Sequence, residues 1–230
     1  MEQEDYSKIY EYESMGKEYA GEKACISLTS WKARINTVSK TLYSLVKMCP
    51  GFHIVLVLSK DEFPLKEKEL PDNLMLFVEN KLIELFWIKP NLKSFKKVLF
   101  TMDKYRDIPV IGADDDCLYT SNYAQELYNK WTNHKDSIIL YRNTNDKHLQ
   151  GPNTLYPPSC FSINKNLMEN LNSFRKKNNS DDTFFTTVAK NNHLNFFFLN
   201  HNSLPFVFHD EIAPIHPNYK HQSYFKNCYL

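Results

Sequence analysis

The sequence predicts an α/β fold, a single domain in which a mostly parallel sheet carries helices on both faces. Short apolar runs of strand length alternate with segments whose apolar residues recur every three or four positions, as in alternating strands and helices. One run, "HIVLVLS" at 53–59, is continuously apolar, which is typical of a strand covered on both faces. The chain has 230 residues, of which 42% are hydrophobic, so it is long enough for one sizeable core.

Residues 24–59 predict the first strand–helix–strand unit. The apolar run at 24–28 has the length of a strand, and the run at 53–59 is the next one. Between them lie apolar residues at helical spacing, namely Ile35, Val38, Leu42, Leu45, Val46 and Cys49. Two strands joined in this way through a helix are expected to lie parallel in one sheet.

The alternation continues along the rest of the chain. The expected strands are 74–80, 82–88, 109–113, 137–142 and 195–199. The expected helices occupy about 92–105, 124–131, 164–176 and 181–192. The segment 143–162 contains one glycine and three prolines, so we expect it to be irregular and to border a site.

Both ends of the chain are expected to lie outside the main domain. Residues 1–23 are charged and rich in tyrosine, with loose periodicity, and are expected to form a peripheral helix or a flexible lead-in. Residues 201–230 are rich in histidine, proline and aromatic residues and are expected to be a tail packed on the domain. The predicted division is therefore 1–23, 24–200 and 201–230.

Composition narrows the class of protein. The formal net charge is +1, which gives no bulk electrostatic reason to expect a nucleic acid or an acidic membrane as partner. The five cysteines are scattered and never form a CxxC pair, which favours a reduced, cytoplasmic setting. No stretch has the apolar run of a signal peptide or of a membrane span, so we expect a soluble protein.

An acidic triplet, Asp114, Asp115 and Asp116, follows the strand expected at 109–113, where α/β sheets bind their ligands. If the chain stays extended, Asp114 and Asp116 point to one side and Asp115 to the other. Mg²⁺ or Mn²⁺ would relieve the repulsion between the carboxylates and would complete its coordination with phosphate oxygens and water. The alternative, which the triplet alone supports equally well, is a solvated acidic turn that binds no metal.

Five blocks of the sequence resemble a known family. They are "ISLTSWKARINTVSKTLYSL", "LKSFKKVL", "IGADDDCLY", "LYPPSCF" and "SDDTFFTTVAK". In their order and spacing they resemble bacterial glycosyltransferases of the GT-A fold from polysaccharide and lipooligosaccharide biosynthesis. The resemblance covers about 24–200 and implies a GT-A-like catalytic domain with a Rossmann-like sheet that holds a nucleotide sugar.

In that family, DxD carboxylates chelate Mn²⁺ or Mg²⁺ against the donor diphosphate. The resemblance implies that Asp116 is the direct metal ligand and that Asp114 binds the ribose or the metal, with Asp115 in the nucleotide-sugar site. It also places the base and ribose near Thr29, Ser30 and Arg34, where the planar guanidinium of Arg34 suits a phosphate. The alternative is that Ser30 caps the next helix and Arg34 is solvated.

The block "KSFKK" places Lys93, Lys96 and Lys97 at the start of a helix. Residues three or four apart share a helical face, so Lys93 with Lys96 or Lys97 can present positive charge to phosphates. A solvated lysine face is the alternative. The resemblance favours one functional lysine in this block, and we take Lys93 and Lys96 as the candidates.

An acidic pair, Asp181 and Asp182, begins the last predicted helix. Ser180 suits an N-cap, and acids in the first turn gain roughly 0.3–1 kcal/mol each from the helix dipole. The resemblance implies that, in an inverting enzyme, a carboxylate of such a motif removes the proton from the acceptor hydroxyl. We expect Asp182 to be this base and Asp181 to position it or an acceptor hydroxyl, and both interpretations can hold together.

The leading hypothesis is a metal-dependent glycosyltransferase of the hexosyl or N-acetylhexosaminyl class. It would move a sugar from a nucleotide-diphosphate donor, a UDP-sugar in the first place, to a saccharide or lipid-linked saccharide acceptor. Among the tail histidines, His209 is the candidate third metal ligand, while Tyr156 either stacks on a sugar or is buried. The aromatic tail would either contact the inner face of a membrane or pack on the core.

Two hypotheses of other classes stay open. A degenerate transferase would bind a sugar nucleotide without turning it over. A nucleotidyltransferase on a related sheet would need a glycine-rich phosphate loop after the first strand, and "LTSWKARIN" contains no glycine.

Overall fold

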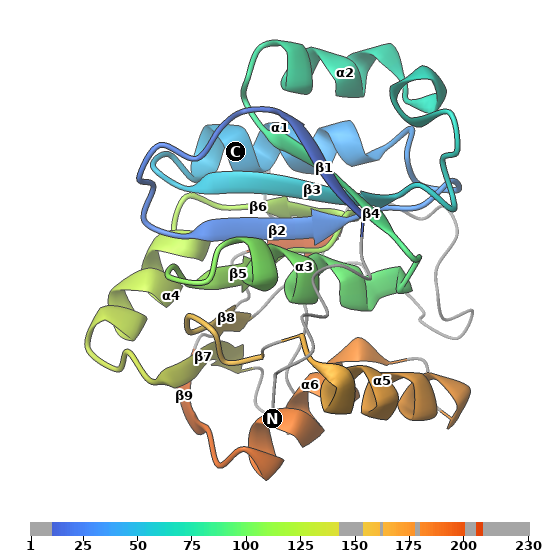
Figure 1. Cartoon of the computed structure of the whole chain (residues 1–230). Helices are drawn as coiled ribbons and strands as arrows, with labels where there is room; N and C mark the ends of the chain where they lie inside the picture. The colour runs from blue at the N-terminus through green and yellow to red at the C-terminus, as the bar shows by residue number, and fades with distance from the viewer. Residues whose placement is uncertain (1–10, 143–153, 162, 178–179, 201–205, 209–230) are drawn as a thin grey trace.

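The computed structural model describes residues 11–142, 154–161, 163–177, 180–200 and 206–208. Eight strands form one sheet in the order β1-β4-β3-β2-β5-β8-β7-β9, and β10 pairs with β6 (Figure 1). The strands are β1 (Glu11–Gly16), β2 (Cys25–Thr29), β3 (His53–Ser59), β4 (Glu84–Lys89), β5 (Val110–Gly112), β6 (Cys117–Tyr119), β7 (Ser137–Arg142), β8 (Thr154–Tyr156), β9 (Asn195–Asn200) and β10 (Phe206–Phe208). The helices are α1 (Val38–Met48), α2 (Asp72–Glu79), α3 (Lys96–Lys104), α4 (Tyr123–Thr132), α5 (Lys165–Lys177) and α6 (Asp181–Asn191), with 3₁₀ turns η2 (Lys66–Glu69) and η3 (Lys93–Phe95).

The centre of the large sheet is parallel. It consists of β4, β3, β2 and β5, and β2 is joined to β3 through α1. The predicted strand–helix–strand unit is therefore confirmed. β8 inserts antiparallel between β5 and β7, whereas β9 lies parallel to β7. The predicted α/β fold is confirmed as a mixed, mostly parallel sheet.

Helices cover both faces of this sheet. Ile26 and Leu28 of β2 are buried on the face that carries α1, α2 and α4. Cys25, Val55 and Val57 are buried on the opposite face with α3, α5 and α6. Figure 1 shows α1 and α2 above the parallel strands and α3, α5 and α6 below them. Because both faces are covered, every residue of β3 is buried, which explains the continuous apolar run from Ile54 to Leu58.

The strand predicted at 74–80 is wrong, because this segment forms α2. Leu74 and Val78, four residues apart, are both buried, whereas Leu76 between them is 56% exposed. This one-sided burial is that of a surface helix. Pro71 and Asp72 at its start are also favourable there, and the sequence prediction passed over this helix-start signal.

The expectation of a helix or a flexible lead-in before residue 24 is also wrong for 11–16, which form β1 at the edge of the sheet. β1 pairs antiparallel with β4 along its whole length, from Glu11 opposite Lys89 to Gly16 opposite Glu84. The ring of Tyr12 lies 5.5 Å from that of Phe86. This strand forms because β4 offers a free edge, and β4 is remote in the sequence.

The C-terminal region contributes β10, which pairs antiparallel with β6 directly after the acidic triplet. The rest of the predicted tail at 201–230 lies outside the described residues, and the division into 1–23, 24–200 and 201–230 stays a prediction. Among the helices that the structure describes, none combines the length and apolar character needed to cross a membrane.

Candidate active site

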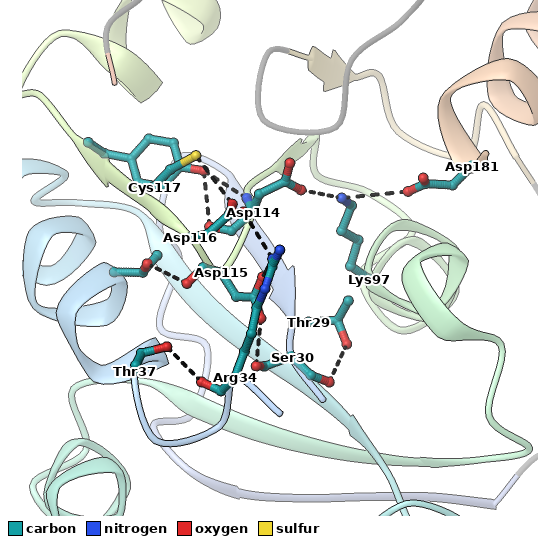
Figure 2. Close-up of polar contacts among 12 residues, drawn as sticks. Thr29, Ser30, Arg34, Thr37, Lys97, Asp114, Asp115, Asp116, Cys117 and Asp181 are labelled. Atoms are coloured by element: carbon teal, nitrogen blue, oxygen red, sulfur yellow. Dashed lines mark hydrogen bonds and ion pairs between the residues drawn. The ribbon is translucent and has the colours of Figure 1, made fainter. Parts of the chain in front are cut away.

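The candidate residues gather where β2 and β5 end. These strands are parallel neighbours, with Ser27 opposite Gly112, so Thr29 and Ser30 come close to the triplet that follows β5. The first turn of α3 lies at the same edge, because α3 packs along β2 and β5. Figure 2 shows these segments converging on one cluster of acidic and basic side chains.

The acidic triplet forms a turn and does not continue the strand. β5 ends at Gly112, and the chain turns at Asp115 and Asp116 into β6. The backbone N–H of Asp114 donates to the hydroxyl of Tyr119 at 2.7 Å. The condition for the expected side-chain alternation, an extended triplet, is therefore not met.

Arg34 lies buried between two of the carboxylates. Its Nη1 is 2.8 Å from Asp115 Oδ1 and 3.0 Å from Asp116 Oδ2. Ser30 Oγ donates to the other Asp115 oxygen at 2.6 Å (Figure 2). Ser30 is therefore not a helix cap and Arg34 is not solvated. Asp115, 6% exposed and bonded on both oxygens, anchors the turn to the segment after β2.

Thr29 connects two strands of the sheet. Its Oγ1 donates to the backbone oxygen of Val57 at 2.6 Å and so ties the end of β2 to β3. α1 begins at Val38, after a series of turns in which Thr37 Oγ1 donates to the Arg34 carbonyl at 3.0 Å. These bonds hold Arg34 in place.

Lys97 joins the triplet to the acidic pair. Its Nζ lies 2.6 Å from Asp114 Oδ1 and 3.5 Å from Asp181 Oδ2 (Figure 2). Burial alone would lower the pKa of Lys97, but the carboxylates of Asp114, Asp181 and Asp182 outweigh it and raise this pKa well above its usual value. Two acidic groups that are 65 positions apart, counted from Asp116 to Asp181, thus meet across one buried ammonium.

The acidic pair occupies the first turn of α6, as predicted. Ser180 is the N-cap, and its Oγ accepts from the backbone N–H of Thr183 at 3.3 Å. The capping interpretation is confirmed. It is compatible with a functional one, because the same helix end lies next to Lys97 and the triplet.

The candidate lysines differ in their surroundings. Lys93 is exposed at η3, and its backbone N–H donates to Asn91 Oδ1 at 2.9 Å. Lys96 is 2% exposed and lies 3.7 Å from Glu62. Burial lowers the pKa of Lys96 to about 8, and the charges of Glu62 and Asp115 oppose this shift. The lysine that contacts the triplet is Lys97, which the sequence analysis named in this block but did not choose as a candidate. Helical spacing alone did not separate it from Lys96.

The carboxylate oxygens of the acidic triplet are ligands of the type that a hard divalent cation prefers. Burial raises the pKa of Asp116 to about 6, with the charge of Asp114 adding to the rise and Arg34 opposing it. The site therefore keeps an excess of negative charge that a cation would relieve. In the described part of the chain, no three His, Cys, Asp or Glu side chains are grouped so as to hold a metal. Two carboxylates with substrate phosphates are nevertheless the usual set for Mg²⁺. His209 lies outside the described residues.

Tyr156 belongs to the core. It is 1% exposed, and its ring lies 5.6 Å from Phe161 and 5.8 Å from Phe185. Of the two interpretations of Tyr156, the buried one is confirmed.

Comparison with solved structures identifies the fold. No protein-family model matches the sequence, and a search of curated proteins found no match. The structure resembles S. aureus TarS at 15% identity over 82% of this chain and 37% of that one, with a TM-score of 0.54. It resembles TarS 1-349 in complex with UDP-GlcNAc at 14% identity, over 84% of this chain and 60% of that one, with a TM-score of 0.54.

A third similar structure is the glycosyltransferase GlyE of Streptococcus pneumoniae TIGR4. The identity is 13% over 78% of this chain and 45% of GlyE, with a TM-score of 0.51. The chain thus spans less than two thirds of each of these proteins. The α/β architecture predicted from the sequence is the fold that this chain shares with them.

Proposed function

We propose that the protein is a glycosyltransferase that takes a sugar from a nucleotide-diphosphate donor. The observation that carries the proposal is the meeting of the acidic triplet and the acidic pair across Lys97, at the carboxyl end of the parallel strands. The shared fold adds support, since one similar structure is a glycosyltransferase and another was crystallised with UDP-GlcNAc. A UDP-sugar, hexosyl or N-acetylhexosaminyl, is therefore the first donor to test.

Mn²⁺ or Mg²⁺ would bind at Asp114 and Asp116, and it would neutralise charge on the departing diphosphate. Arg34 is a weaker phosphate candidate than the sequence indicated, since Asp115 and Asp116 already engage its guanidinium. Lys96 remains a candidate because its ion pair with Glu62 is long, 3.7 Å, whereas exposed Lys93 would act only at the rim. Ser30 and Thr29 would shape the floor beneath the nucleotide.

His209 remains the candidate third ligand of the cation. Its support is the register of β10, in which Phe208 lies opposite Cys117. Phe208 directly precedes His209, and Cys117 directly follows Asp116. An imidazole at this position in the sequence suits Mn²⁺ better than Mg²⁺.

The acidic pair would supply the general base. Asp182 would remove the proton from the acceptor hydroxyl as it attacks the anomeric carbon, and Asp181 would position the helix end. Both acids lie in the first turn of α6, where the helix dipole favours a negatively charged side chain. This arrangement implies inversion at the anomeric centre, and such a base contributes about 10²–10⁴-fold to the rate.

The acceptor and the cellular setting follow by analogy with the family that the sequence resembles. We propose a saccharide or lipid-linked saccharide acceptor in bacterial polysaccharide or lipooligosaccharide synthesis, in the cytoplasm or at the inner face of the membrane. A sugar-nucleotide binder without turnover is the alternative of a different class. A nucleotidyltransferase is less favoured, because the turns before α1 lack the glycines of a phosphate loop.

The proposal is tested by incubating the protein with a panel of nucleotide sugars and Mn²⁺ and measuring release of the nucleotide. Asp116→Asn and Asp182→Asn should each lower kcat/KM by about 100-fold or more, as expected for loss of charge stabilisation or of a base. Asp136→Asn, an exposed acid before β7, is the matched control and should retain full turnover. Full activity in both site variants would contradict the proposal. Binding of UDP without turnover of any donor would favour the non-catalytic alternative.

A further inference from the structure

We propose that Lys97 is a positioning residue shared by the donor site and the acidic pair. Lys97 pairs with Asp114, and when a divalent cation binds Asp114, the ammonium moves its ion pair to Asp181. The inference deepens the proposed function, on which it rests for the identity of the cation and the donor.

The backbone of Lys97 is hydrogen-bonded to the core, whereas its side chain has a long, flexible stem. Ser27 Oγ donates to the Lys97 carbonyl at 2.7 Å, and a hydrogen bond of 2.7 Å connects the hydroxyls of Ser27 and Thr101. These bonds fasten the first turn of α3 to β2 inside the core. Lys97 is only 4% exposed, so water solvates its ammonium poorly and nearby acids have to balance the charge.

The two acids around Lys97 are engaged unequally. Asp114 Oδ1 is at hydrogen-bond distance, 2.6 Å, whereas Asp181 Oδ2 is at 3.5 Å. Asp181 Oδ2 is buried and accepts no hydrogen bond from the described residues. The ammonium therefore has a second acceptor within reach, and a small rotation of its flexible stem would bring the two atoms to hydrogen-bond distance.

A cation on Asp114 would drive this rotation. Lys97 and a divalent ion are both positive and both seek the same carboxylate, so they compete for Asp114 and repel each other. Once displaced, the ammonium would pair with Asp181 and hold the first turn of α6, with Asp182, against the donor site. Occupancy of the donor site would thereby fix the position of Asp182, the candidate base. Because such coupling is reciprocal, fixing the first turn of α6 would in turn favour binding at the donor site.

The proposal predicts that Lys97→Met raises the affinity for Mn²⁺ and lowers kcat. Mn²⁺ should bind the nucleotide-free variant more tightly, by about 5-fold or more, since its competitor is gone. At the same time kcat should fall by about 10- to 100-fold, because the acidic pair loses its anchor, while KM for the donor changes less. Lys97→Arg keeps the positive charge and should return the Mn²⁺ affinity towards the wild-type value. Lys190→Met, an exposed lysine in the last turn of α6, is the matched control and should change neither quantity.

The experiment uses the full chain, with Mn²⁺ titrated by electron paramagnetic resonance and transfer followed by nucleotide release. Equal weakening of Mn²⁺ affinity and kcat, or no change in either, would show a purely structural lysine and overturn the proposal. If Lys97→Met fails to fold, Asp181→Asn carries the test. It removes the second acceptor, so Mn²⁺ should bind more weakly, and unchanged affinity would overturn the proposal.

The two proposals fail in different ways. Tighter Mn²⁺ binding by Lys97→Met in a protein that transfers no sugar would contradict the proposed function and uphold the ion-pair exchange. An active transferase whose Mn²⁺ affinity does not rise in Lys97→Met would contradict the exchange and leave the function standing.

Discussion

Charged side chains are buried at both ends of the parallel strands, and the two clusters are balanced differently. At the amino end, Glu84 begins β4 and is contacted by Lys104, by the hydroxyl of Tyr105 and by His53 Nε2, the last at 2.8 Å. Burial would raise the pKa of Glu84, but His53, Lys104 and Tyr105 outweigh it and lower this pKa. The acid at this end is fully compensated.

At the carboxyl end, the basic side chains do not balance all of the acidic charge. Arg34 and Lys97 compensate Asp115 and Asp114, yet burial and neighbouring acids still raise the pKa of Asp116 to about 6. A buried acid whose pKa stays raised despite its ion pair costs stability, and such a group in a cluster of acids is a candidate for ligand binding. The difference separates the amino-end cluster from the candidate site, although both contain buried ion pairs.

The largest effect should come from breaking the amino-end cluster. Glu84→Ala would leave His53, Lys104 and Tyr105 without their shared acceptor, and should lower the free energy of unfolding by about 3–5 kcal/mol. Urea denaturation at pH 7 measures this change. Glu79→Ala, an exposed acid at the end of α2, should stay within about 0.5 kcal/mol of wild type. A loss no larger than that of the control would mean that this cluster contributes little.

A smaller effect of opposite sign should come from the carboxyl end. Asp116→Asn removes a repelled charge, so in EDTA at pH 7 it should raise the free energy of unfolding by about 1–2 kcal/mol. A folded pKa above the unfolded value of 3.8 means that stability rises as the pH falls through 6, when Asp116 takes up its proton. The gain from Asp116→Asn should therefore shrink at pH 5. A lower free energy of unfolding for Asp116→Asn would contradict the prediction, because it would mean that the ion pair with Arg34 outweighs the repulsion from the other acids.

The smallest effect concerns the acid limb of the stability curve. Tyr105→Phe removes one donor to Glu84 and should cost about 1 kcal/mol at pH 7. Because the folded pKa of Glu84 is depressed, its contribution is present above 4.5 and is lost as the pH falls through the folded value. Without Tyr105 that pKa rises, so the loss should begin at a higher pH. Urea denaturation between pH 7 and pH 3 tests the shift, and an unmoved acid limb would contradict it.

Much of the fold follows from periodicity. The uninterrupted run of β3 and the helical spacing of α1, α3, α4 and α6 are local features that survive in the structure, because burial on one or both faces dictates them. The exceptions are the helix α2 and the strands β1, β6, β8 and β10, which are all short. The apolar run of α2 fits a strand as well as a helix until its neighbours are known, and β1 exists through its pairing with β4.

The residue types of the candidate site also followed from the sequence, which marked the acidic triplet, the acidic pair, Arg34 and the lysines of the "KSFKK" block. Only the tertiary structure decided their partners. It turned the triplet at Asp115, buried Arg34 between two carboxylates and placed Lys97 rather than Lys96 between Asp114 and Asp181. The physical reason is that charge compensation depends on distances between side chains from separate elements, and local spacing along the chain does not contain those distances.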